Sequence, residues 1–309
     1  MFDNLSLFFA KRMSRINDNV IRLDGMRLPS TLPRHSKKII KNSFRYKNSL
    51  TKDVEINVGQ SHYRFRCGNW LEFKRCMTLL IKEPGTCDWI RKFVAGGSVF
   101  YDVGSNIGIY SILAAERVGE SGKVFAFEPH AANFSRLLEN IRANHLQDIV
   151  TACAFALHEK NGFFPFDYVS GETGSSNSQL CCISRGTTAE NQTYASEIKN
   201  AVSIDYLISS GGFPPPDNVK IDVDGNEFLI LRGMSNLLKS SSRPKSVQVE
   251  ISKSERAPIL SFMKDNDYKP LNEHCSIYVT ELIAEGQSPA ELVSNMIFVP
   301  KNQAASLSV

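Results

Sequence analysis

Short apolar runs alternate with amphipathic segments in the middle of the chain. Runs of strand length cover residues 98–103, 123–127 and 149–155. Between the second and third runs, apolar residues follow the i, i+3, i+4, i+7 spacing of one helix face, at Phe134, Leu137, Leu138 and Ile141. Strands that alternate with helices in this way predict an α/β fold, with a mostly parallel sheet covered by helices on both faces.

The same alternation returns in the last third of the chain. Further strands are expected at 218–223, 246–251 and 296–299, with helices over 226–233 and 255–265. The residues between the two halves, 170–200, are rich in Ser, Gly, Thr and Asn and predict a mobile loop.

The region before the sheet divides into two parts. Residues 54–95 predict an N-terminal cap of short strands and helices, and residues 1–53 form a basic extension with weak helical periodicity. The main domain is therefore expected over 96–300, followed by a tail over 301–309.

Charge is distributed unevenly over the 309 residues, whose net charge is +4. The extension carries twelve Lys and Arg against four Asp, so its net charge is +8 and that of the remainder is −4. Such an arm could contact a membrane, or it could be a solvated extension. It lacks the interleaved aromatic residues of RNA-reading segments, so no nucleic-acid partner is expected. The sequence carries no signal for the oligomeric state.

Cysteine spacing and the first residues bear on the compartment. None of the seven cysteines forms a C-x-x-C pair, so neither a zinc ribbon nor a dithiol redox centre is indicated. The apolar opening, residues 1–10, is too short to span a bilayer, and Asp3 stands where a signal peptide carries positive charge. We therefore expect free thiols and a cytoplasmic protein.

The most informative segment is the glycine-containing turn Asp-Val-Gly-Ser-Asn-Ile-Gly at residues 102–108. It joins an apolar strand to a helix, which is where open α/β sheets bind ligands. Glu128 ends the next strand, 20 residues beyond Gly108. A carboxylate at that position can accept hydrogen bonds from both ribose hydroxyls of an adenosine.

Electrostatics separates the two cofactor types that use this arrangement. A dinucleotide presents an anionic pyrophosphate and needs a glycine at the position of Asn106, and Asp102 would repel the phosphates. S-adenosylmethionine (SAM) carries an ammonium and a sulfonium, which both favour a nearby carboxylate. We therefore expect SAM, bound by Asp102, Gly104, Ser105, Asn106, Gly108 and Glu128. A dinucleotide-dependent oxidoreductase and a plain structural turn are the alternatives.

Several motifs of one family occur together, at residues 102–111, 127–129, 156–162, 203–207, 219–227, 231–233 and 249–251. Together they resemble the FkbM family of SAM-dependent methyltransferases, over roughly residues 84–300. The resemblance implies a class I methyltransferase fold, Rossmann-like, with seven strands of which the last is antiparallel, and methylation of a hydroxyl oxygen. One departure is Asp224, where the family more often has Glu.

A second acidic cluster follows the strand at 218–223. By strand alternation Lys220 and Asp222 share a face, and we expect Asp222 to be the base or the group that orients the acceptor. Glu227 is the second catalytic candidate. Both carboxylates could instead cap the next helix.

Other chemistry stays open at this cluster. Asp222, Asp224 and Glu227 could together hold a divalent ion, although no metal ligand is assigned. The other possible bases are His130, His158, His274 and Glu250.

The sequence is therefore interpreted as a SAM-dependent O-methyltransferase acting on a small-molecule or saccharide hydroxyl, with the loop 170–200 covering the acceptor. A non-catalytic scaffold with a relic cofactor pocket is the remaining alternative.

Overall fold

A computed structural model describes residues 42, 51–58, 60–180, 193–288 and 292–302. The chain divides into two units, Met1–Leu50 and Thr51–Val309, and every element below belongs to the second. Almost all of the predicted extension thus lies outside the described residues, as does most of the tail. Residues 52 and 53, placed in the extension, belong instead to the first strand of the cap.

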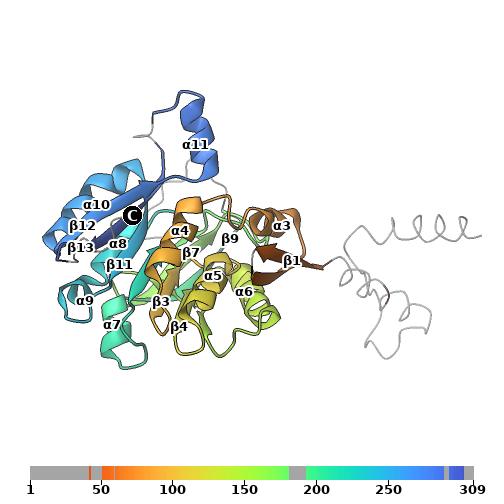
Figure 1. The fold of residues 1–309 in the computed structure, drawn as a ribbon, viewed down its shortest axis with the longest axis horizontal. Coiled ribbons are helices and arrows are strands. Elements are labelled where there is room, and N and C mark those ends of the chain that lie inside the picture. The colour runs from red at the N-terminus through yellow and green to blue at the C-terminus, as the bar shows by residue number, and fades with distance from the viewer. Residues whose placement is uncertain (1–41, 43–50, 59, 181–192, 289–291, 303–309) are drawn as a thin grey trace, which may run out of the picture. The chain divides into compact units, whose positions relative to one another are not determined.

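A seven-stranded sheet in the order β12-β13-β11-β10-β3-β4-β5 forms the centre of the second unit (Figure 1). Its strands are β3 (Val99–Val103), β4 (Lys123–Phe127), β5 (Val150–Cys153), β10 (Asn218–Ile221), β11 (Ser246–Ile251), β12 (Tyr268–His274) and β13 (Ser294–Pro300). Strand β13 runs antiparallel to both of its neighbours, and the other pairs are parallel. The predicted mostly parallel sheet, with its last strand antiparallel, is confirmed.

Alternate residues of β3, β4 and β13 face two separate core layers. Phe100 packs in the layer formed by α4 (Pro84–Phe93), α5 (Ile109–Val118) and α6 (Ala131–Ala143). Tyr101 packs in the opposite layer, which contains residues of α7 (Ile204–Ser209), α8 (Glu227–Arg232), α9 (Ser235–Lys239) and α10 (Lys253–Asp265). Because both faces of β3 and β4 are covered, these strands read as nearly continuous apolar runs in the sequence. The expected helices on both faces are present.

Glycines set the limits of α5, the helix that follows the glycine-containing turn. Gly108 precedes it with φ of 90°, and Gly119 follows it with φ of 65°. Positive φ is readily adopted by glycine, so these two residues can flank the helix without strain.

A second sheet occupies part of the interval where one long loop was expected. It has the order β6-β9-β7-β8 and consists of β6 (Ala156–Leu157), β7 (Gly162–Tyr168), β8 (Gln179–Leu180) and β9 (Ala195–Val202). The predicted loop 170–200 therefore ends in a strand, and its residues 181–192 lie outside the described part of the chain. Strand β9 is polar and mostly exposed until Ala201, so it carries little of the apolar signal of a strand.

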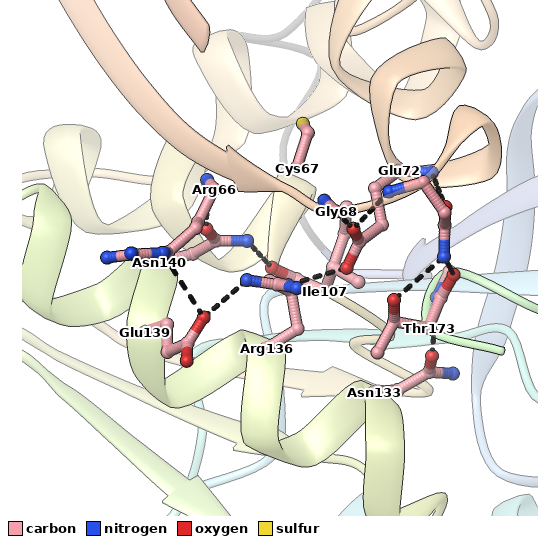
Figure 2. A network of polar contacts seen from close by, with 12 residues as sticks. Arg66, Cys67, Gly68, Glu72, Ile107, Asn133, Arg136, Glu139, Asn140 and Thr173 are labelled. Carbon is pink, nitrogen blue, oxygen red and sulfur yellow. Dashed lines mark hydrogen bonds and ion pairs between the residues drawn. The ribbon is translucent and has the colours of Figure 1, made fainter. Parts of the chain in front are cut away.

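The cap consists of the hairpin β1 (Lys52–Val58) and β2 (Ser61–Cys67), followed by α3 (Trp70–Met77). Figure 2 shows how it is joined to α6 through Glu72, whose side chain is fully buried. The Glu72 carboxylate accepts hydrogen bonds from Arg136 Nε at 2.5 Å and from the Gly68 and Asn69 amides at 2.5 and 3.2 Å. Burial of this carboxylate is offset by three donors, so the cap and α6 are coupled.

The same helix also holds the glycine-containing turn. Asn140 on α6 accepts from the Arg66 amide of the cap at 2.7 Å and donates to the Ile107 carbonyl at 2.8 Å (Figure 2). Helix α6 therefore connects the cap to the turn that follows β3.

Helix α11 (Ile277–Ala284) lies between β12 and β13 in the chain. No helix in the described residues has both the length and the apolar character required to cross a bilayer.

We predict that Glu72→Ala lowers the free energy of unfolding by about 3–5 kcal/mol, because it leaves the Arg136 guanidinium and two backbone amides without their buried partner. Chemical denaturation would measure the change. The control is Glu139→Ala, which removes the half-exposed second partner of Arg136 and should change stability by less than about 1 kcal/mol. Equal effects of the two substitutions would contradict this account of the cap.

Candidate functional site

The carboxyl ends of β3, β4 and β10 meet at one edge of the sheet, around a cavity. Four of the predicted site residues line this cavity, namely Gly104, Asn106, Glu128 and Asp222. Further walls come from the beginning of α6, from the residues that follow β5, from the chain between β7 and β8, and from the turn after β10 that leads into α8.

Gly104 brings the turn after β3 into contact with the end of β10. Its φ is 82°, and a Cβ atom at this position would lie 1.8 Å from the carbonyl oxygen of Asp222. The Asp222 amide also donates to the Val103 carbonyl at 3.0 Å. No side chain fits between these two backbone segments, so the close approach depends on glycine.

Glu128 is 5% exposed and lines the cavity from the end of β4. Its Oε2 accepts from the Asn106 amide and its Oε1 from the His130 amide, both at 2.7 Å. Burial raises the pKa of Glu128 to about 7, although these two hydrogen bonds favour the charged form.

Asn106 occupies the position where a dinucleotide fold requires glycine. Its φ of 51° lies in the left-handed region, which Asn tolerates better than most residues. Its side-chain nitrogen donates to the Ser175 carbonyl at 2.8 Å. The side chain therefore joins the turn after β3 to the chain that crosses the cavity.

We call this crossing chain, residues 170–178, the strap. The Ser175 carbonyl accepts a second hydrogen bond from Asn133 Nδ2 at 3.1 Å, and the Gly174 amide donates to Asn133 Oδ1 at 2.7 Å. From the cap, Arg75 Nε donates to the Gly174 carbonyl at 2.6 Å and Asn69 Nδ2 to the Thr173 carbonyl at 2.9 Å. The strap is thus tied to both α6 and α3, and its Ser175, Ser176 and Ser178 line the cavity.

The buried Lys220 and the partly buried Asp222 form an ion pair at the end of β10. Lys220 is 1% exposed and its Nζ lies 2.6 Å from Asp222 Oδ2. Burial acts to raise the pKa of Asp222, but the charges of Lys220 and Lys82 outweigh it, so the pKa is lowered. Asp222 is therefore a carboxylate at neutral pH.

The pKa values of two further carboxyl groups near Asp222 are raised rather than lowered. Burial raises the pKa of Glu227 to about 8, and its Oε1 accepts from the Val223 and Gly225 amides at 2.9 and 3.1 Å. The charge of Asp222, followed by burial, raises the pKa of Glu250 to about 9. At neutral pH Asp222 is therefore charged, whereas Glu227 and Glu250 are mostly protonated.

Four predicted site residues do not line the cavity: Asp102, Ser105, Gly108 and Glu227. Asp102 is fully buried, pairs in register with Lys220, and accepts from Ser111 Oγ at 2.6 Å. A Cβ on Gly108 would lie 2.6 Å from Leu137 Cδ1, so this glycine permits close packing with α6. None of these four residues therefore forms part of the cavity wall.

Sequence reasoning did not single out Asn133 and Phe155, which line the cavity, whereas Leu157 lies in a family motif and Ser175 in the predicted substrate loop. Phe155 and Leu157 follow β5, so their place beside the ends of β3 and β4 follows from the alternation of strands and helices. Asn133 gives no such signal, because a polar residue in the first turn of a helix is ordinarily exposed. Of the histidines, His130 lines the cavity and His158 does not.

No group of three or more His, Cys, Asp or Glu suited to a metal ion occurs within the described residues.

Residues 102–270 match the model of the methyltransferase FkbM domain, and the chain belongs to this family. The chain is also 32% identical, over 142 residues, to hexuronic acid methyltransferase AglP of Haloferax volcanii. That match covers 46% of this chain and 52% of AglP, so the chain spans about half the length of this relative.

Solved structures with a similar fold include two methyltransferases. The FkbM methyltransferase of Methylobacillus flagellatus KT is 14% identical, with a TM-score of 0.41, covering 65% of this chain and 43% of that one. A SAM-dependent O-methyltransferase of Thermotoga maritima is 12% identical, also with a TM-score of 0.41, covering 80% and 77%. Likeness at this level carries no argument about substrate.

We predict that Gly104→Ala weakens binding of S-adenosylhomocysteine at least about tenfold and destabilises the fold, because the methyl group would overlap the Asp222 carbonyl. Calorimetric titration and thermal unfolding would measure the two effects. Gly97→Ala is the matched control, since Gly97 has φ of 79° but a Cβ there would meet no atom closer than 3.4 Å. Unchanged binding by Gly104→Ala would show that the close approach is not required.

We also predict that affinity for S-adenosylhomocysteine depends on the protonation of Glu128. If Glu128 accepts from the ribose hydroxyls as the sequence predicts, binding favours its deprotonated form, and a group with a pKa of about 7 must lose its proton on binding at lower pH. The affinity should therefore be nearly constant above pH ~7.5 and fall about tenfold per unit below pH ~6.5. Glu128→Gln should bind more weakly, with no such slope. A flat profile for the unsubstituted protein would contradict the role given to Glu128.

Proposed function

We propose that this protein transfers a methyl group from SAM to a hydroxyl oxygen of a saccharide or other small molecule. The observation that carries the proposal is that Glu128 and Asp222, at the ends of two strands on either side of β3, line the same cavity beside Gly104. Membership of the FkbM family supports a methyltransferase over the alternative of an oxidoreductase.

The residues of the cavity fit SAM in three respects. Glu128 offers a buried carboxylate to the ribose, and Phe155 and Leu157 offer apolar surface to the adenine. Asp224 supplies negative charge for the ammonium of the amino-acid end, and Asp222 supplies it for the sulfonium. When bound, SAM supplies an electrophilic methyl group on a sulfonium. We propose that Asp102, Ser105 and Gly108 support this site from behind the cavity wall.

The group proposed to accept the proton is Asp222. Its Oδ2 is held by Lys220, while its Oδ1 accepts no hydrogen bond from any residue that the structure describes. The free oxygen can take the hydroxyl proton as the new bond to the methyl carbon forms, which typically contributes 10²–10⁴-fold to the rate. Lys220 keeps the carboxylate charged and limits its rotation. Glu227 would act indirectly, by holding the backbone turn after Asp222.

A saccharide acceptor is favoured by the relative AglP, which is named as a hexuronic acid methyltransferase. The strap adds hydroxyl groups of three serines to the cavity, and these can hydrogen-bond a polyol. We propose that the reaction takes place in the cytoplasm, with the residues around the strap covering the acceptor.

We predict that Asp222→Asn lowers turnover at least about tenfold while leaving affinity for S-adenosylhomocysteine within a small factor, because the amide cannot accept the proton. Transfer of labelled methyl from SAM to a sugar acceptor would measure turnover. Glu250→Gln is the matched control: the pKa of Glu250 is about 9, so this carboxyl is already neutral at pH 7 and its amide should leave turnover nearly unchanged. Full turnover of Asp222→Asn would remove Asp222 from the proton transfer.

A further inference from the structure

A second hollow lies beside the end of β10, between the cap and α5. It is lined by Arg75, Thr78, Leu79, Lys82, Ile109 and Tyr110, and we call it the cationic groove. It adjoins the proposed catalytic group, because the Lys220 ammonium that binds Asp222 lies 4.9 Å from the centre of the Tyr110 ring.

Two positive charges line this groove, and neither is fully engaged by the protein. Lys82 Nζ lies 2.7 Å from Glu83 Oε1, yet the Lys82 side chain remains 35% exposed, so the ammonium has donors left for a ligand. Arg75 uses Nε and Nη2 to bind the strap, at the Gly174 carbonyl and Ser176 Oγ. Its Nη1 has no hydrogen-bond partner among the residues with a described position.

The two cations of the groove also interact electrostatically with Asp222 and Asp224. Lys82 and Arg75 both act to lower the pKa of Asp222 and that of Asp224, against the effect of burial. A neutral acceptor would leave these two cations without a function in binding. An anion held between them would form charge-assisted hydrogen bonds, which are about twice as strong as neutral ones.

We propose that the cationic groove binds an anionic group of the acceptor, a carboxylate or a phosphate, through Lys82 and Arg75. The preferred acceptors of the methyl transfer are then acidic saccharides rather than neutral ones. This inference rests on the proposed function, because it assigns the second substrate of the same site.

The test is calorimetric titration of the full chain, saturated with S-adenosylhomocysteine, with D-glucuronate, D-glucose 6-phosphate and D-glucose. We expect at least one of the two anions to bind about tenfold or more tightly than glucose. Lys82→Met should remove most of this preference, and Lys82→Arg should retain it. Lys74→Met is the matched control, since Lys74 is an exposed lysine of α3 that stacks on Tyr278 outside the groove.

Equal binding of the three sugars, or binding of none, would overturn the inference whatever the variants do. The inference would also be overturned if Lys82→Met still bound the anion as much more tightly than glucose as the unsubstituted protein does, with unchanged melting temperature and unchanged affinity for S-adenosylhomocysteine. The relative affinities of glucuronate and glucose 6-phosphate distinguish a carboxylate ligand from a phosphate. Selective binding of an anion without any methyl transfer from labelled SAM would contradict the proposed function. The inference that the groove binds an anion would still be supported.

Discussion

A lysine ammonium buried in the central sheet organises the chemistry of this molecule. Lys220 on β10 is the neighbour in register of Asp102 on β3, and its ammonium forms an ion pair with Asp222. Desolvation opposes a buried ammonium, and the two aspartates together with Glu83 more than compensate, so the pKa of Lys220 is raised. The charge is therefore permanent, and it keeps Asp222 ionised, while burial and the charge of Asp222 raise the pKa values of the neighbouring Glu227 and Glu250.

The cavity walls depend on contacts made far from that charge. The strap is held through Asn133 and Asn106 on the sheet side and through Arg75 and Asn69 on the cap side. Since α3 is in turn tied to α6 through Glu72 and Arg136, the cap takes part in closing the cavity. One consequence is that Arg75 belongs to two substructures, the strap over the cavity and the cationic groove.

Six of the seven strands were predictable as short apolar runs, because most of their residues are buried. Strand β12 was not predicted, since most of its residues are exposed. The positions of Gly104, Asn106 and Glu128 in the cavity also follow from strand ends that meet at one edge. Strands β7 and β9 escaped prediction, since β7 contains Pro165 and β9 alternates mostly exposed residues. The orientation of Asp102 was not predictable from the glycine motif alone. Asp102 pairs in register with Lys220, and its carboxylate accepts a hydrogen bond from Ser111 of α5.

A crystal structure with S-adenosylhomocysteine would test directly whether Glu128 binds the ribose and whether Asp222 faces the methyl position. We expect the ribose hydroxyls within hydrogen-bond distance of Glu128, and Asp222 Oδ1 directed at the empty methyl position beside the sulfur. The account fails if the ligand binds elsewhere on the chain. It fails equally if the ligand enters this cavity but the sulfur lies remote from Asp222.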